Sequence, residues 1–199
     1  MPFSDQKKLL FIHIPKCGGT SIEKSFPEKR PFIGYGIFKN KALQHLNYSE
    51  YKKIYHTRWN TYETFSIVRD PYKRFISDYN FINNIYIRKN ISVLSIDDYL
   101  DRAEKILNGE EFDKYDDHFY LQTSYIFNNE NELMVKNLFK LENIDEIKDF
   151  LKKYDLLMLH KNKGKKTNEE VILTNEQKER FYNIYKKDYE LLEYKFLNI

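Results

Sequence analysis

Residues 15–21, Pro-Lys-Cys-Gly-Gly-Thr-Ser, combine the residue types that hold a phosphate-like anion. The two adjacent glycines let the backbone approach a ligand without a Cβ in the way. A helix is predicted to start at about Thr20 or Ser21, and the free N–H groups and positive dipole of a helix start favour an anion. Lys16 adds a compact positive charge. The segment therefore predicts a local anion site.

The spacing of this turn differs from that of a Walker A loop. In Walker A, the lysine follows the second glycine and directly precedes Ser or Thr. Here Lys16 precedes both glycines, which disfavours an ATPase or a P-loop kinase. A purely structural alternative is a strand-to-helix turn that needs glycine and caps its helix with Thr20.

A second turn carries an arginine. Arg69 follows the apolar run 64–68, and Ser77 lies on the helix predicted after it. The planar guanidinium matches a phosphate with two parallel hydrogen bonds. Arg69 alone could pair with an acidic neighbour, but in combination with the first turn the signal becomes specific.

The elements that must position these turns follow from the apolar pattern. Residues 9–14 and 64–68 are short apolar runs, typical of strands buried on both faces of a parallel sheet. After the second run, Asp70 can cap a helix and Pro71 suits its first position. Further signals are a weak strand at 132–141, helical stripes at 144–154 and 181–192, and a capping box at 174–177.

Strands that alternate with helices predict an α/β fold with a mostly parallel sheet flanked by helices. Ligands of such sheets bind at the carboxyl ends of the strands, which is where both turns lie. The length of 199 residues fits a single domain over 1–199.

Composition excludes several classes of protein. Lys plus Arg (33) nearly balance Asp plus Glu (30), and the net charge of +3 does not favour nucleic-acid binding. Cys17 is the single cysteine, so an internal disulfide or a cysteine-based metal site is ruled out. We find no run near the roughly 20 apolar residues of a membrane span, and expect a soluble protein in a reducing compartment.

The two turns resemble motifs of the sulfotransferases, in particular the carbohydrate branch with the heparan-sulfate enzymes and many bacterial relatives. The 5′-phosphosulfate loop corresponds to IPKCGGTS (14–21) and the 3′-phosphate motif to IVRDPYKRFISDY (67–79). Three matches are looser: Gln44-His45-Leu46 with a later glutamate, Asp117-His118-Phe119 with Gln122, and a basic loop at 161–167.

The resemblance implies the sulfotransferase variant of the P-loop α/β fold and the donor 3′-phosphoadenosine 5′-phosphosulfate, without a metal. The 5′-phosphosulfate would be held by the first turn, that is by Lys16, Cys17, Gly18, Gly19, Thr20 and Ser21. Arg69 and Ser77 would hold the 3′-phosphate. Lys165 and Lys166 of the basic loop would close over that phosphate or meet an anionic acceptor. A solvated surface loop is the alternative for them.

Sulfuryl transfer needs a base for the acceptor proton, and histidine suits this role because its pKa lies near neutrality. By the resemblance, His45 is the predicted base and His118 the second candidate. A carboxylate is a further alternative. His13 lies within the first strand and is expected to be structural, whereas His56 and His160 have no supporting pattern.

The predicted acceptor is a hydroxyl on a carbohydrate or glycan. The alternatives are a lipid or a small metabolite as acceptor, or a nucleotide-binding protein without transfer activity. Golgi-resident relatives in animals have a membrane anchor that this chain lacks, so we expect a bacterial cytoplasmic enzyme. The sequence does not indicate the oligomeric state.

Overall fold

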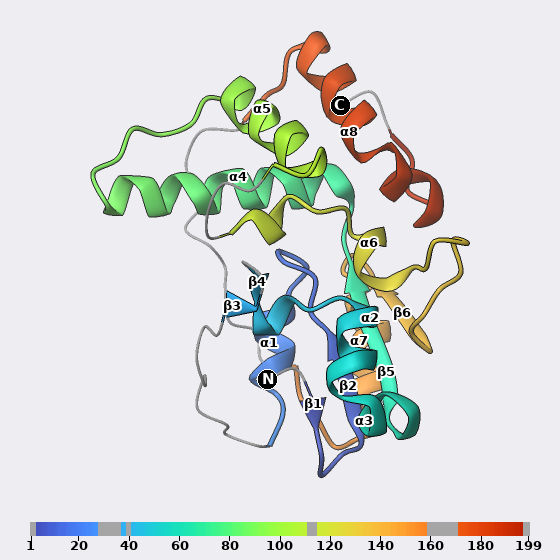
Figure 1. Ribbon diagram of the computed structural model, residues 1–199. Helices are drawn as coiled ribbons and strands as arrows, with labels where there is room; N and C mark the ends of the chain where they lie inside the picture. Colours follow the sequence, from blue (N-terminus) through green and yellow to red (C-terminus); the bar gives the residue numbers. More distant parts are fainter. Residues whose placement is uncertain (1–2, 28–36, 39–40, 111–114, 159–170, 197–199) are drawn as a thin grey trace.

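The computed structural model describes residues 3–27, 37–38, 41–110, 115–158 and 171–196. Its main sheet has four strands in the order β1 (Phe3–Ser4), β2 (Leu9–Ile12), β5 (Glu63–Val68) and β6 (Asn137–Lys140) (Figure 1). β2, β5 and β6 are parallel, and β1 pairs antiparallel with β2. A separate pair is formed by β3 (Ile37–Phe38) and β4 (Lys41–Ala42). The predicted mostly parallel sheet is confirmed.

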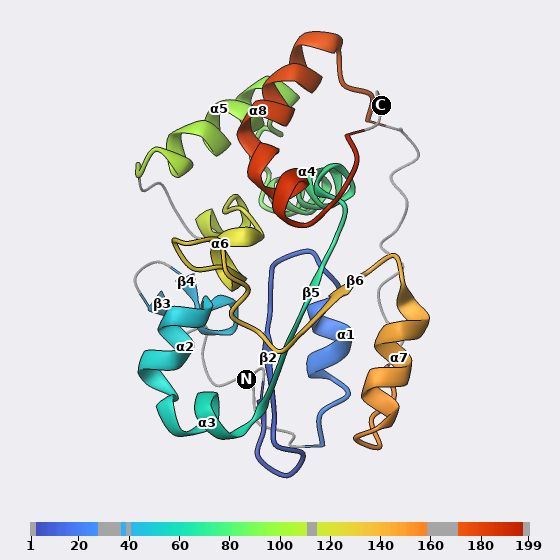
Figure 2. The same ribbon diagram turned by 90° about the vertical axis from the view of Figure 1, so that its right-hand side faces the viewer.

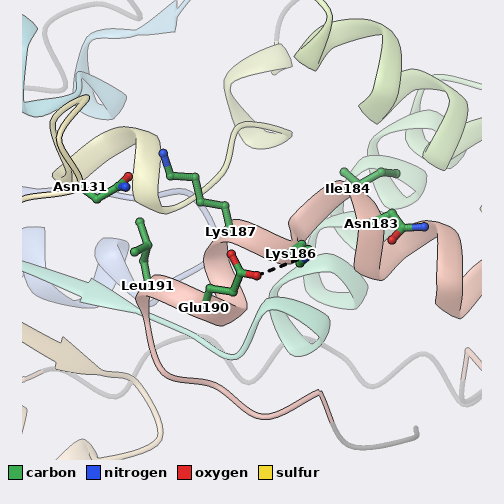
Figure 3. Close-up of a pocket in the computed structure, with 7 residues that line it drawn as sticks. All are labelled: Asn131, Asn183, Ile184, Lys186, Lys187, Glu190 and Leu191. Atoms are coloured by element: carbon green, nitrogen blue, oxygen red, sulfur yellow. Dashed lines mark ion pairs between the residues drawn. The ribbon is translucent and has the colours of Figure 1, made fainter.

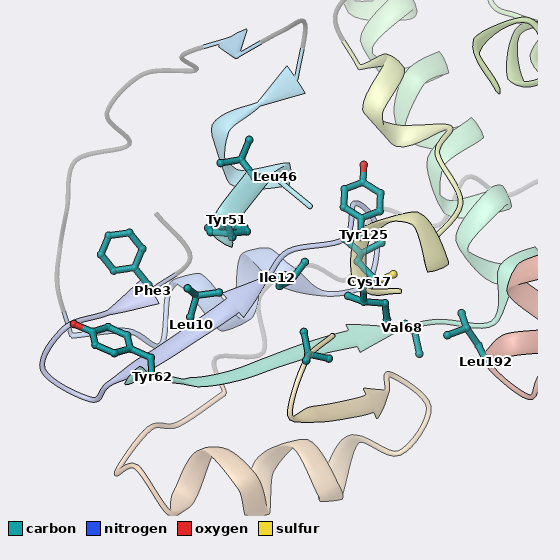
Figure 4. Close-up of a cluster of buried hydrophobic side chains, with 13 residues drawn as sticks. Phe3, Leu10, Ile12, Cys17, Leu46, Tyr51, Tyr62, Val68, Tyr125 and Leu192 are labelled. Atoms are coloured by element: carbon teal, nitrogen blue, oxygen red, sulfur yellow. The ribbon is translucent and has the colours of Figure 1, made fainter. Parts of the chain in front are cut away.

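Helices cover both faces of this sheet (Figure 2). One face carries α2 (Tyr48–Ile54) and α3 (His56–Thr61), and the other carries α1 (Gly19–Glu23) and α7 (Ile144–Lys152). Successive strand residues point to opposite faces. Leu10 and Ile12 accordingly join the core under α2 (Figure 4), whereas Leu9 and Phe11 join the core under α1 and α7.

A third layer of helices lies beyond the carboxyl ends of the strands (Figure 1). It contains α4 (Pro71–Arg88), α5 (Ile96–Leu107) and α8 (Asn175–Leu191). An aromatic core joins the three helices through Phe75, Tyr99 and Phe181, each at most 3% exposed. The layer therefore covers the edge of the sheet at which ligands of parallel sheets bind.

Short helical segments connect these layers. They are the 3₁₀ turns Leu43–His45 and Asp116–His118 and the helix α6 (Thr123–Ile126). The first two segments end on the two histidines that the sequence singles out as candidate bases.

Local capping explains where the long helices begin. The Asp70 side chain accepts a hydrogen bond from the N–H of Lys73, and Pro71 takes the first helical position, as predicted. The predicted capping box of Thr174 and Gln177 starts α8. At α1 the cap by Thr20 that the structural alternative predicts is wrong, because the N-cap is Gly18 at φ 81° and no side chain caps that helix.

Candidate active site

The first turn joins β2 to α1 by residues in unusual backbone conformations. Lys16 and Gly18 have φ angles of 68° and 81°, in the left-handed region that costs a non-glycine residue energy. The N–H groups of Gly18, Gly19 and Thr20 find no carbonyl partner in the part of the chain that the structure describes. The turn thus leaves amide donors free to bind an anion.

Gly19 is required by a close approach to His13. A Cβ built on Gly19 would lie 2.1 Å from Cδ2 and from Nε2 of the His13 ring. That ring is itself fixed, because its Nδ1 lies 2.7 Å from Oε1 of Glu23 on α1. Burial raises the pKa of Glu23, but the hydrogen bond to His13 and the nearby positive charges together leave this pKa below its usual value. His13 therefore packs α1 against the sheet, in keeping with its expected structural role.

Replacing Gly19 by alanine is expected to destabilise the fold by about 1–3 kcal/mol or more, as overpacking does in a tight interior. The buried His13 ring would have to leave its place and give up its bond to Glu23. Denaturant unfolding measures this loss. Gly109→Ala is the control, because its Cβ would meet no atom within 4 Å and its cost comes from φ 93° alone. A smaller loss for Gly19 than for Gly109 would contradict the steric account.

The Lys16 side chain turns toward the helical layer. Its Nζ lies 4.0 Å from the centroid of the Phe81 ring of α4, a cation–π contact. Burial lowers the pKa of Lys16, and the charges of Arg69 and Arg74 act in the same direction, whereas Asp78 partly opposes them. A desolvated ammonium close to free amides is well placed to neutralise an anionic oxygen.

The second turn lies beside the first because β5 pairs directly with β2. Nη1 of Arg69 donates to the carbonyl of Lys16 at 3.3 Å, which links the two turns directly. Ser77 lies half-buried two turns into α4. The structure therefore brings Lys16 and Arg69 together, as the sequence predicts, and places Ser77 on the helix that follows Arg69.

Three histidines form a row behind these turns. The rings of His13 and His45 have centroids 4.8 Å apart, and those of His45 and His118 are 5.3 Å apart, all in edge-on contact. Phe81, which Lys16 contacts, stacks on His118 at 5.4 Å. The two predicted bases thus lie side by side and are linked to Lys16 by one aromatic ring.

Each candidate base is held by a buried carboxylate. Nδ1 of His45 lies 2.6 Å from Oδ2 of Asp117, and Nδ1 of His118 lies 2.6 Å from Oδ1 of Asp78. Tyr99 donates its hydroxyl to the other oxygen of Asp78. A carboxylate on Nδ1 fixes the tautomer and leaves Nε2 as the basic nitrogen. Both imidazoles are therefore held in the same way, with Nδ1 bound to a carboxylate.

The two histidines differ at Nε2. Nε2 of His45 lies 3.2 Å from the side-chain nitrogen of Gln44. Nε2 of His118 makes no hydrogen bond to other residues within the described ranges. The pKa of His45 is lowered to about 4, mainly by burial; the bond to Asp117 opposes this shift, and the charges of His13 and His118 add to it. His45 is thus neutral, the form that a base needs, well below neutral pH.

The low pKa of His45 predicts a loss of stability in acid. An unfolded histidine has a pKa of 6.5, so between about pH 6.5 and 4 the unfolded chain binds the additional proton. As the pH is lowered through this window, the free energy of unfolding should decrease. The contribution of His45 to this decrease is up to about 3 kcal/mol. Denaturant unfolding of wild type and His45→Gln at pH 7 and 4.5 measures it. The variant should lose less stability than wild type, and an equal loss would refute the assignment.

His45, Asp117 and His118 also place possible metal-ligand atoms within 4.8 Å of one another. However, Nδ1 of His45 and Oδ2 of Asp117 are 2.6 Å apart, the length of a charge-assisted hydrogen bond. Two ligands on a tetrahedral zinc lie roughly 3.3 Å apart, since each is about 2.0 Å from the ion. We therefore interpret His45 and Asp117 as a hydrogen-bonded pair, beside which His118 is bonded to Asp78.

Residues that the sequence reasoning missed support this arrangement. Arg74 is buried and donates to two carbonyls, Nε to that of Pro15 at 3.0 Å and Nη2 to that of His118 at 2.8 Å. It therefore ties the first turn to the segment of the second candidate base. Arg74 and Asp78 lie four residues apart on one face of α4, and this helical spacing within the arginine motif is the signal that could have revealed them.

Several predictions fall outside the described residues or away from the site. Lys165 and Lys166, with the remainder of the basic loop at 161–167, lie outside the described residues, as does His160. His56 lies on α3, exposed and bonded to Asn60.

A pocket of about 420 Å³ lies along α8 (Figure 3). Lys186 and Glu190 form an ion pair of 3.7 Å beside it. None of the predicted site residues lines this pocket, so it adds nothing to the candidate site.

The two central strands of the mostly parallel sheet are β2 and β5. They end in the first turn (residues 15–21), called the glycine turn from here on, and in the second turn at Arg69, called the arginine turn. This arrangement defines a P-loop-like α/β fold. The family model described as the sulfotransferase family matches residues 1–195. The chain therefore belongs to the sulfotransferase family, with which the carbohydrate branch is consistent, and its family chemistry is sulfuryl transfer. No curated protein and no solved structure matches it significantly. Among the described helices, none has both the length and the apolar character needed to cross a membrane.

Proposed function

We propose that the protein transfers a sulfuryl group from 3′-phosphoadenosine 5′-phosphosulfate to a hydroxyl of a carbohydrate. One observation carries the proposal. The glycine turn and the arginine turn lie on adjacent parallel strands and are joined by the bond from Arg69 to the carbonyl of Lys16. Two anion-binding turns at one sheet edge fit a nucleotide that carries two separate anionic groups.

The donor would bind across both turns. The first turn, from Lys16 to Ser21, would hold the 5′-phosphosulfate with its free amides and the lysine ammonium. The thiol of Cys17 is buried and directed at Gln122, and its N–H donates to the carbonyl of Ile14 at 3.3 Å, so Cys17 would shape the turn without contacting the donor itself. Arg69 and Ser77 would hold the 3′-phosphate. The expectation that Lys165 and Lys166 close over this phosphate stays a prediction.

The chemistry is an in-line displacement at sulfur. The acceptor oxygen forms a bond to sulfur, the bond from sulfur to the bridging phosphate oxygen breaks, and adenosine 3′,5′-bisphosphate leaves. Lys16 would neutralise the charge that develops on the leaving oxygen. The acceptor proton would pass to Nε2 of His45, while Asp117 stabilises the imidazolium that forms. His118 is bound at Nδ1 by the carboxylate of Asp78 in the same way and is the second candidate for the base.

The acceptor is tested by following labelled sulfur. The protein is incubated with ³⁵S-labelled donor and with polysaccharides, lipids or small hydroxyl compounds. We expect protein-dependent label in the carbohydrate fraction, and about 100-fold less or lower still with Lys16→Met at equal time. Label in the lipid or small-molecule fraction would instead show that the acceptor is a lipid or a small metabolite. Absence of label from all fractions, with donor bound, would favour a nucleotide-binding protein without transfer activity.

A further inference from the structure

Gln122 connects the two donor-binding turns through its side chain. Its Oε1 accepts from the backbone N–H of Arg69 at 2.9 Å and from the thiol of Cys17 at 3.2 Å. Its Nε2 donates to the carbonyl of Arg69 at 2.8 Å. The side chain is fully buried. One side-chain amide thus binds both the backbone N–H and the backbone carbonyl of Arg69, and it also contacts the glycine turn through Cys17.

Gln122 is itself held from α8. The carboxylate of Asp188 accepts the N–H of Gln122 at 2.9 Å, and it accepts both the N–H and the hydroxyl of Thr123 at 2.9 Å. Asp188 is completely buried. Three donors converge on one carboxylate, so the start of α6 has little freedom to shift relative to the helical layer.

Cys17 lies in the core beneath the turns (Figure 4), where its thiol contacts Gln122. Burial raises the pKa of the Cys17 thiol to about 12, so the thiol is protonated and donates toward Gln122. Because Cys17 is the single cysteine of the chain, any opening between the two turns can be followed as its reaction with a thiol reagent.

We propose that Gln122 is a positioning residue that sets the separation of the two donor-binding turns, and that Asp188 holds Gln122 in place. The proposal rests on the proposed function for the identity of the ligand. Arg69 and the first turn can engage the two ends of the nucleotide together only at a fixed separation. The amide that spans both turns is the group that fixes it.

The test compares Gln122→Met with Asn83→Ala. Methionine fills the space of glutamine but makes neither amide bond to Arg69. Asn83 is a matched control, because it binds the peptide of Leu94 in the same two-sided way, at 2.9 and 3.1 Å, in the helical layer. For each protein, calorimetry gives the Kd of adenosine 3′,5′-bisphosphate, and a thiol reagent gives the labelling rate of Cys17 without denaturant.

We expect Gln122→Met to raise the Kd by about tenfold or more, because without these hydrogen bonds the arginine turn is in its binding position only a fraction of the time. Cys17 should react faster in it than in Asn83→Ala, whose Kd should stay within about twofold of wild type. Asp188→Asn should repeat the effect of Gln122→Met in weaker form, and it serves if the first variant does not fold. An unchanged Kd in both site variants would overturn the proposal.

The readouts separate this inference from the proposed function. If wild type does not bind the bisphosphate, the proposed donor is wrong, while the labelling comparison still tests Gln122. Cys17 labelling no faster in Gln122→Met than in Asn83→Ala would then overturn the positioning role.

Discussion

Replacing Lys16 by methionine is expected to slow sulfuryl transfer by about 10²- to 10³-fold, as the loss of one preorganised charge-stabilising group does. The methionine side chain keeps the length of lysine and its contact with Phe81, but it offers no charge to the leaving oxygen. Steady-state kinetics with ³⁵S-labelled donor measures the rate.

The same substitution should not destabilise the fold, although it slows the reaction. Burial lowers the pKa of Lys16, which means that the desolvated ammonium reduces the stability of the folded protein. The free energy of unfolding of Lys16→Met should therefore equal or exceed that of wild type. Lys24→Met, on the exposed end of the same turn-helix unit, should change neither rate nor stability. Full activity of Lys16→Met would contradict the role assigned to Lys16.

Replacing His45 by alanine is expected to slow transfer by about 10²- to 10⁴-fold, the usual contribution of a general base. The imidazole is oriented by Asp117 and has a pKa of about 4, so its basic form is present throughout the neutral range. Kinetics at pH 7 measures the loss, and added imidazole should restore part of the rate by entering the space that alanine leaves.

Two further variants make this result decisive. His56→Ala removes an exposed histidine on α3 and should leave the rate unchanged. His118→Ala removes the neighbouring imidazole, which is held by Asp78. Full activity of His45→Ala together with an inactive His118→Ala would move the base to His118.

The turns themselves were predictable because their signals are local. The apolar run, the paired glycines and Lys16 lie within about a dozen residues, and Arg69 directly follows β5. Parallel pairing of β2 with β5 then brings the two turns together. A pattern of neighbours in sequence, combined with one rule on sheet topology, was sufficient for this half of the site.

The pairings behind the turns were not predictable in the same way. His118 meets Asp78 across 40 residues and His45 meets Asp117 across 72. Such contacts depend on how the helical layer packs onto the sheet. The periodicity of apolar residues within one helix or strand does not predict this packing. The resemblance supplied His45, His118 and the segment around Asp117, but not which carboxylate each histidine binds.

One missed helix did have a local signal. In α5, Tyr99, Leu100, Ala103 and Ile106 are buried at helical spacing, and Ser95 with Asp98 forms a capping box. These residues supply one wall of the aromatic core that supports α4. The sequence therefore contained enough to predict the third layer, although not its position over the strand ends.

The central claim is that two turns bind the two phosphate groups of one nucleotide. Calorimetric titration with adenosine 3′,5′-bisphosphate, AMP and ATP tests it most directly, since AMP differs from the bisphosphate only in lacking the 3′-phosphate. The bisphosphate should bind about 10- to 100-fold more tightly than AMP, the value of charge-assisted bonds to one phosphate. Arg69→Met should remove this preference. Binding of AMP or ATP as tightly as the bisphosphate by the wild-type protein would contradict the account.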